Sequence, residues 1–185
     1  MKRIAIALSV VVLVLAAQMG TLVGVLSGQE QHPVIKNAGA YVPMPHAAVQ
    51  PDKTHQYKAI FEAVRAAAEV KEIIPALEDA AALVNGLAAG AVPPANRRIV
   101  VVFYGPAAYG ILDNETYRQK YGADNPNLQV ISELRQAGVE LFVCGQWLRY
   151  KNIEESKVVS DVQIAADALI VVVAYQNRGY AHLIY

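Results

Sequence analysis

The run RRIVVVFYG at residues 97–105 constrains the fold more than any other part of this sequence. Its apolar positions are continuous rather than alternating, so both faces of the strand that it predicts must be covered by other parts of the chain. Such runs are typical of parallel strands buried between two layers of helices. The run ends at Gly105 and Pro106, a turn that predicts where the strand meets the edge of its sheet.

Strand and helix patterns alternate along the chain before and after this run. YKAIFEAV at residues 57–64 predicts a first strand. Apolar positions at the helical period over residues 73–88 then predict a helix that has Pro75 in its first turn and stops at Gly90. This order, strand then helix then strand, is that of a parallel βαβ unit.

The second half of the chain continues the pattern after a loop with polar helical character at residues 109–122. Asn125 is expected to cap a helix with Pro126 at its first position, and VELFVC at residues 139–144 predicts the next strand.

The last third of the chain is more ambiguous. DVQIA at residues 161–165 alternates like a strand, whereas residues 167–178 fit either a strand or a helix. We choose a helix there because Gly179 suits the position just after a helix, and residues 180–185 then supply a final strand.

These patterns predict an α/β protein with three layers, in which helices cover both faces of a mainly parallel sheet of roughly five strands. Chemistry in such folds lies beyond the carboxyl ends of the strands. Two turns, one at Gly105 and Pro106 and one at Cys144 and Gly145, end strands that we expect to be neighbours. We therefore expect the two turns to meet at one edge of the sheet.

The first 28 residues have the pattern of an export segment. Lys2 and Arg3 precede an uncharged, largely apolar stretch at residues 4–28. A cleaved signal peptide and an uncleaved membrane anchor both fit, because the stretch is long enough to span a bilayer; a buried core helix is the third alternative. Either of the first two places the rest of the chain in the periplasm or cell envelope, attached to the membrane at most through this segment.

The export segment is followed by residues 29–56, which hold four prolines and no sustained period. They predict a proline-containing tether, or an arm lying over the domain. The domain itself is expected at residues 57–185.

Charge and composition exclude several classes of function. The export segment holds two of the 16 basic residues and none of the 16 acidic ones, so the remainder is weakly acidic and nucleic acid is not an expected partner. The four histidines are scattered, which predicts no metal site. YGPAAYG lacks the G-x-G-x-x-G spacing and the chain has no P-loop, so no nucleotide or other cofactor is expected.

Cys144 is the candidate functional residue. As the only cysteine it has no partner for an internal disulfide, which suits exchange chemistry with other molecules. We expect its thiol to be presented to solvent at a strand tip before a short helical turn, where the helix dipole, with Arg149 and Lys151, favours the thiolate. The alternative is a small buried hydrophobic residue, which free cysteines usually are.

Five segments, taken together, resemble the DsrE (DsrE/DsrF-like) family over residues 57–185, in its YchN-like, flavodoxin-like fold. These segments are YKAIFEAV, LVNGL, IVVVFYGPAAYGILDNETY, NPNLQVISELRQAGVELFVCGQ and QNRGYAHLIY. The chain resembles the exported, single-domain members more than the cytoplasmic subunits of sulfur-relay complexes. In sulfur-relay members a strand-end cysteine receives a persulfide and passes it to a partner, and Cys144 has a similar place. Relatives often have histidine where this chain has Tyr104, which leaves hydrogen bonding or packing to the tyrosine.

Two functions follow. The first is a persulfide carrier or sulfurtransferase, with Cys144 as the reacting residue and sulfur donor and acceptor proteins or small sulfane compounds as partners. Its expected substrate contacts are Tyr104, Gly105, Pro106, Gly145 and Gln146. The alternative is a non-catalytic oligomeric binding or scaffolding module with a structural Cys144, because the almost wholly apolar residues 168–174 suit a face hidden in an assembly. The family resemblance also implies a homo-oligomer.

Overall fold

A computed structural model describes residues 28–185, so the predicted export segment lies outside the described residues except for Gly28. Five strands form one sheet in the order β4-β3-β2-β1-β5. Every neighbouring pair of strands is parallel, and the prediction of a mainly parallel five-stranded α/β sheet is confirmed. The strands are β1 (Tyr57–Ala63), β2 (Arg97–Phe103), β3 (Glu140–Cys144), β4 (Gln163–Ala165) and β5 (Ala181–Ile184).

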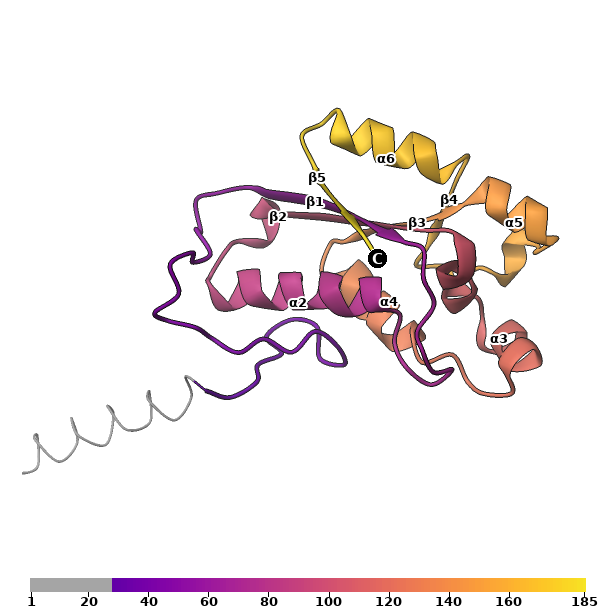
Figure 1. Cartoon of the computed structure of the whole chain (residues 1–185), viewed down its shortest axis with the longest axis horizontal. Helices are drawn as coiled ribbons and strands as arrows, with labels where there is room; N and C mark the ends of the chain where they lie inside the picture. Colours follow the sequence, from indigo (N-terminus) through magenta and orange to yellow (C-terminus); the bar gives the residue numbers. More distant parts are fainter. Residues whose placement is uncertain (1–27) are drawn as a thin grey trace, which may run out of the picture.

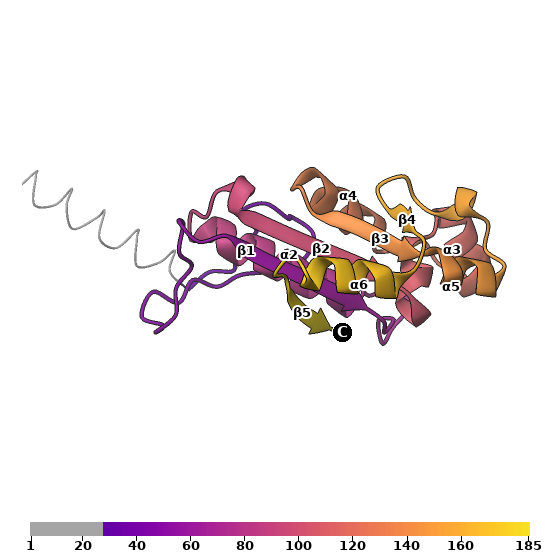
Figure 2. The ribbon, with the colours of Figure 1, turned by 90° about the horizontal axis from the view of Figure 1, so that it is seen from above.

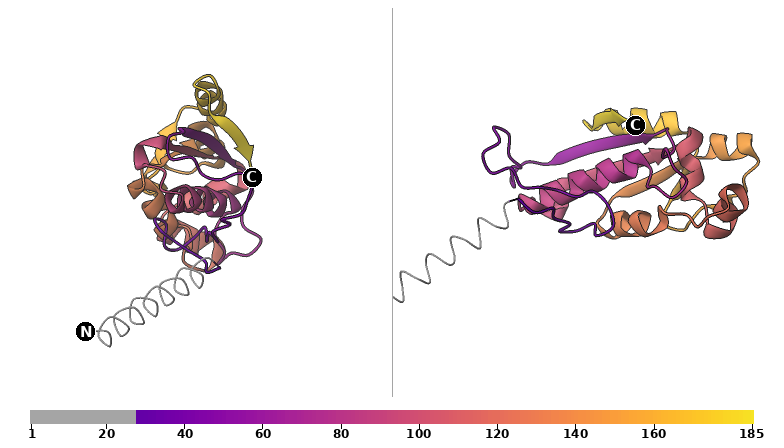
Figure 3. Two further views of the ribbon diagram at one scale, coloured as in Figure 1. Left: turned by 90° about the vertical axis from the view of Figure 1, so that its left-hand side faces the viewer. Right: turned by 60° about the horizontal axis from the view of Figure 1, so that its bottom comes forward.

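Helices cover both faces of the sheet and give the three predicted layers. Helices α2 (Pro75–Ala89) and α4 (Leu128–Gln136) lie on one face, and α6 (Ala168–Gln176) lies on the other (Figure 1, and end-on in the left view of Figure 3). Seen from above, α6 runs along β1 and β2 (Figure 2). No helix within residues 28–185 is long and apolar enough to cross a membrane. The connecting helices are η1 (Pro94–Asn96), η2 (Gly105–Ile111), α3 (Asn114–Tyr121), α5 (Gly145–Lys151) and η3 (Glu155–Lys157).

The continuous apolar run becomes β2, the middle strand of the sheet. Because side chains alternate between faces along a strand, Ile99, Val101 and Phe103 pack with α2 and α4, whereas Val100 and Val102 pack with α6. All five side chains are at most 1 % exposed. Coverage from both sides is the physical reason why no position from Ile99 to Phe103 is polar, whereas Arg97 and Arg98 begin the strand where it is less covered.

The predicted ends of α2 are confirmed, whereas the predicted start of α4 is wrong. Pro75 is the first residue of α2, and Gly90 follows its last residue, as expected. Helix α4 begins at Leu128, so the prediction that Asn125 caps it is wrong. The buried side chain of Asn125 instead donates hydrogen bonds to the carbonyl oxygens of Gly110 and Leu112, both at 2.8 Å, and so joins this turn to η2.

The segment preceding β1 packs in part against the domain. Residues 31–41 form an arm below α2 and α4, drawn in indigo in Figure 1 and seen again in Figure 3. Ile35 of the arm is fully buried. Of the two alternatives for residues 29–56, this part therefore lies over the domain rather than extending away from it.

One buried side chain of α2 holds most of the arm. Asn85 is fully buried, and its Oδ1 accepts hydrogen bonds from the backbone N–H groups of Val34 and Ile35 at 3.0 and 2.9 Å. Its Nδ2 donates to the carbonyl oxygens of Ile35, Ala38 and Gly39 at 2.9, 3.2 and 2.8 Å. The backbone polar groups of a buried, irregular segment need such partners. The side chain of Asn85 therefore supplies the arm with the backbone hydrogen bonds that a neighbouring strand would otherwise supply.

Candidate functional site

Cys144 is the last residue of β3 and lies next to Tyr104, which directly follows the neighbouring strand β2. Phe103 pairs with Val143 in the parallel register, so the two residues that follow are adjacent, and both face α6. The prediction that the turns after β2 and β3 meet at one edge is confirmed. The sheet register alone brings these two side chains together, although 40 positions separate them in the sequence.

The prediction that the thiol is presented to solvent is wrong, because Cys144 is only 6 % exposed. The chain leaves β4 and crosses above this face as α6 on its way to β5 (Figure 2). The first turn of α6, with the buried Ala168, packs on the apolar cluster that contains Cys144. Arg149 and Lys151, expected to support the thiolate, are both exposed on α5.

A carboxylate lies beside the sulfur. Sγ of Cys144 is 4.0 Å from Oδ1 of Asp167, at the limit of a hydrogen bond that involves sulfur. The same oxygen accepts a hydrogen bond of 2.9 Å from the backbone N–H of Leu169, so Asp167 is the N-cap of α6. Sequence reasoning found no acid or base near Cys144. Its only available signal was an aspartate directly before a predicted helix, which marks a cap but not a neighbour of the thiol.

A second carboxylate stands behind Tyr104. The Tyr104 hydroxyl donates to Oε2 of Glu62 at 2.6 Å, and Nε2 of His182 lies 2.8 Å from Oε1 of the same carboxylate. Glu62 is 7 % exposed. Burial, together with the hydrogen bond to Glu62, raises the pKa of Tyr104 to about 12, so the phenol stays protonated at physiological pH.

These side chains form a polar row along one face of the sheet. His182, Glu62 and Cys144 lie on β5, β1 and β3, and Tyr104 directly follows β2; these four strands are consecutive in the sheet. Sequence reasoning missed Glu62 and His182. A glutamate inside the apolar run YKAIFEAV was the available signal, because a buried charge needs a partner.

Gly145 and Gln146 lie at an open groove between α5 and the end of β4. The groove has a volume of about 660 Å³ and is also lined by Arg149 and Ala166. A Cβ atom added at Gly145 would stand 2.8 Å from the carbonyl oxygen of Ala165, so the chain's own backbone occupies the space that this glycine leaves. Gln146 Nε2 donates to the carbonyl oxygen of Ala166 at 3.2 Å.

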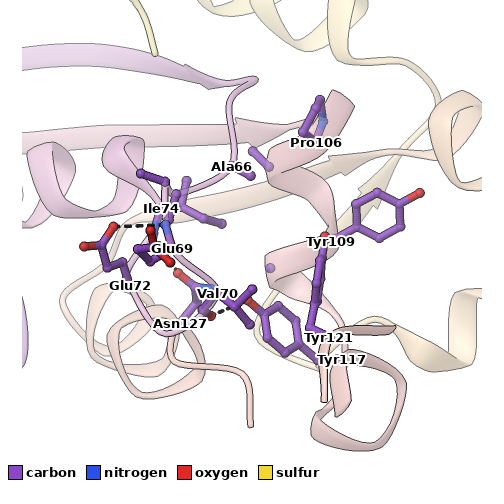
Figure 4. A pocket seen from close by; sticks show the side chains of 14 residues that line it. Ala66, Glu69, Val70, Glu72, Ile74, Pro106, Tyr109, Tyr117, Tyr121 and Asn127 are labelled. Atoms are coloured by element: carbon purple, nitrogen blue, oxygen red, sulfur yellow. Dashed lines mark hydrogen bonds between the residues drawn. The ribbon is translucent and has the colours of Figure 1, made fainter. Parts of the chain in front are cut away.

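Gly105 and Pro106 lie at a different place from the groove. Gly105 has φ +60° and packs against Val64. Pro106 lines a separate cavity of about 220 Å³ (Figure 4). Tyr117 and Tyr121 lie along one side of this cavity and the loop at residues 69–72 along the other; the residues that line it do not include Cys144.

The predicted site residues therefore fall into three groups. Tyr104 is beside the sulfur, Gly145 and Gln146 border the adjoining groove, and Pro106 belongs to the separate cavity. The groove and the sulfur are close in the chain, because Gly145 directly follows Cys144 and Ala166 precedes Asp167. In residues 28–185, no three histidine, cysteine, aspartate or glutamate side chains gather closely enough to hold a metal ion.

Comparison with known proteins identifies a protein family that this chain matches. A sequence model of the DsrE/DsrF-like family matches residues 47–185, a range that includes all five strands and Cys144. Among solved structures, the chain is similar to a protein of unknown function from Methanobacterium thermoautotrophicum, with 18% sequence identity and a TM-score of 0.48. That match covers 70% of this chain and 100% of the other. No curated protein matches the sequence.

Proposed function

Since the chain belongs to the DsrE/DsrF-like family, which is known for sulfur relay, we propose that it carries sulfane sulfur on Cys144. In uptake, the bond between the outer two sulfurs of a donor breaks and a new S–S bond forms at Sγ. The thiol proton leaves with the departing part of the donor, and no external oxidant is needed. A nucleophile on an acceptor then removes the outer sulfur and restores the thiol.

The neighbours of the sulfur carry this proposal. A purely structural cysteine is normally packed as a small apolar side chain. Cys144 has apolar neighbours on the sheet, but a carboxylate of Asp167 lies 4.0 Å from its sulfur and Tyr104 packs beside it. Placing a charged group beside a buried side chain has a free-energy cost, which a purely packing role for Cys144 would give no reason to accept. Cys144 is only 6 % exposed, so a donor needs a local opening of the apolar side chains packed around the sulfur.

The proposal also has a location and partners. Lys2, Arg3 and the uncharged residues 4–28 support export to the cell envelope, with the segment cleaved or kept as an anchor. Sulfur donors and acceptors there are proteins or small sulfane compounds.

The test of this function is sulfur uptake by the native protein. After incubation with a hydropersulfide donor and removal of excess reagent, intact mass spectrometry should show one added sulfur atom per chain. Dithiothreitol should remove it, because a persulfide is reducible. A mass that never changes, under conditions in which the denatured chain does take up sulfur, would contradict the relay function.

A second function, an oligomeric module, is favoured by the outer face of α6. Leu169, Ile170 and Val173 on this face are 67 %, 62 % and 56 % exposed. A surface helix normally turns such residues inward. We propose that a second copy of the chain covers them, which leaves a persulfide function on Cys144 possible in the same assembly.

A charge on this face should break the assembly. Ile170→Lys places an ammonium group in a contact that would have to be apolar, and we expect the dissociation constant to rise at least about tenfold. Gln176→Lys, at the last residue of the same helix, is the matched control and should leave assembly unchanged. Sedimentation equilibrium measures both variants. A wild-type protein that is monomeric at high micromolar concentration would refute the assembly.

A further inference from the structure

We propose that Asp167 makes Cys144 selective for sulfane donors that react in an uncharged form, such as hydropersulfides, and disfavours doubly charged donors such as thiosulfate. This inference rests on the proposed function and specifies the substrate class of the same site. It assigns a selectivity role to a residue that also caps a helix.

Any donor that reacts with Cys144 must come close to the carboxylate of Asp167. The Asp167 carboxylate oxygen is 4.0 Å from Sγ and is held there by the backbone N–H of Leu169. A donor must bring its sulfane sulfur to about 2 Å from Sγ, the length of an S–S bond. The rest of a small donor then lies within a few ångströms of the carboxylate. Cys144 is buried and Asp167 is half-buried, and at that distance like charges repel by an amount that salt reduces only in part.

No cation in the described part of the chain neutralises Asp167. The ion pairs within residues 28–185 are Arg118 with Asp124 and His182 with Glu62. Arg149 borders the groove next to Gly145, but it is exposed and forms no ion pair with Asp167. The second carboxylate of the region, that of Glu62, is already bound by Tyr104 and His182. Asp167 is thus the uncompensated charge at the sulfur.

The two donor classes place different charges beside Asp167. A hydropersulfide reacts as the protonated RSSH: its S–S bond breaks, the outer sulfur bonds to Sγ, and RS⁻ takes up the thiol proton to leave as RSH. Thiosulfate transfers its outer sulfur in the same way but brings two negative charges and releases sulfite. Both reactions balance without an oxidant, so the expected difference is one of electrostatics alone.

Asp167→Asn tests this inference because it removes the charge and keeps both the shape and a good N-cap. We expect sulfur uptake from thiosulfate to become roughly tenfold faster, as for the loss of one nearby charge repulsion. Uptake from a small alkyl hydropersulfide, released in situ, should change by less than about twofold on the same argument. The ratio of the two rates, read by intact mass over time, is the measured quantity.

Asp113→Asn is the matched control, since Asp113 caps α3 by accepting a hydrogen bond from Thr116 N–H at 2.6 Å. It removes the same charge from the same kind of position and should leave both rates unchanged. An unchanged ratio in Asp167→Asn would overturn the inference. A parallel fall of both rates would also overturn it, because Asp167 would then serve as a proton acceptor. Wild-type protein that takes sulfur from neither donor would instead refute the proposed function itself.

Discussion

Replacement of Cys144 by serine should reduce sulfur uptake from one atom per chain to none. Serine has nearly the same size and still offers a proton to Asp167, so the site keeps its shape. Its oxygen cannot form a stable persulfide, and this chain has no second cysteine to take over the reaction. Intact mass spectrometry of native wild-type and Cys144→Ser proteins, treated side by side with the same donor, gives the answer.

A folding control completes this comparison. Cys144→Ser should retain the circular dichroism spectrum of the wild type, and Asp113→Asn, which leaves the thiol in place, should take up sulfur normally. Equal mass gain in Cys144→Ser and the wild type would show that sulfur is held elsewhere. The role of Cys144 would then be structural, and the assembly function would be the better account of this chain.

Asn85→Ala should lower the free energy of unfolding by about 3–4 kcal/mol, a loss in the range found when a buried hydrogen-bond network is broken. The variant removes five hydrogen bonds from α2 to the arm. The backbone N–H and carbonyl groups of Ile35 would then be buried without partners, or the arm would have to leave the domain. Urea denaturation measures the change in free energy.

Hydrogen exchange distinguishes a weakened arm from a weakened domain. In Asn85→Ala the amides of residues 31–41 should lose protection before those of β2 do, because the sheet does not depend on Asn85. Asn96→Ala is the matched control: it removes the same side chain but a single hydrogen bond, from Nδ2 to the carbonyl oxygen of Lys53 at 3.1 Å. It should cost less than about 1.5 kcal/mol. A similar small cost in Asn85→Ala would mean that the arm contributes little to stability.

Most of the fold was predictable because its signals are local. The apolar run of β2 required cover on both faces, and Pro75 and Gly90 marked the ends of α2. The last helix was ambiguous because residues 168–174 are apolar all round and lack a clear period. Packing decided it: a helix there buries Val171, Val172 and Tyr175 on the sheet, and Asp167 caps its first turn.

The candidate site was only partly predictable. The meeting of Gly105 and Cys144 at one edge followed from the rule that successive parallel strands are neighbours. No such rule predicted that Asp167 lies beside the sulfur or that His182 lies beside Glu62. Asp167 is 23 positions from Cys144, and His182 is 120 positions from Glu62, so nothing in local spacing connects them.

The sequence by itself determined the α/β alternation, the parallel sheet and the strand-end position of the thiol, since periodicity and turn residues act over a few neighbouring positions. The tertiary structure alone decided that Cys144 is covered, that Asp167 faces its sulfur and that Asn85 binds the arm. These features depend on where α6 crosses the sheet and on how the strands pair. Both are set by the packing of the whole chain, because contacts between distant segments form only when every layer is in place.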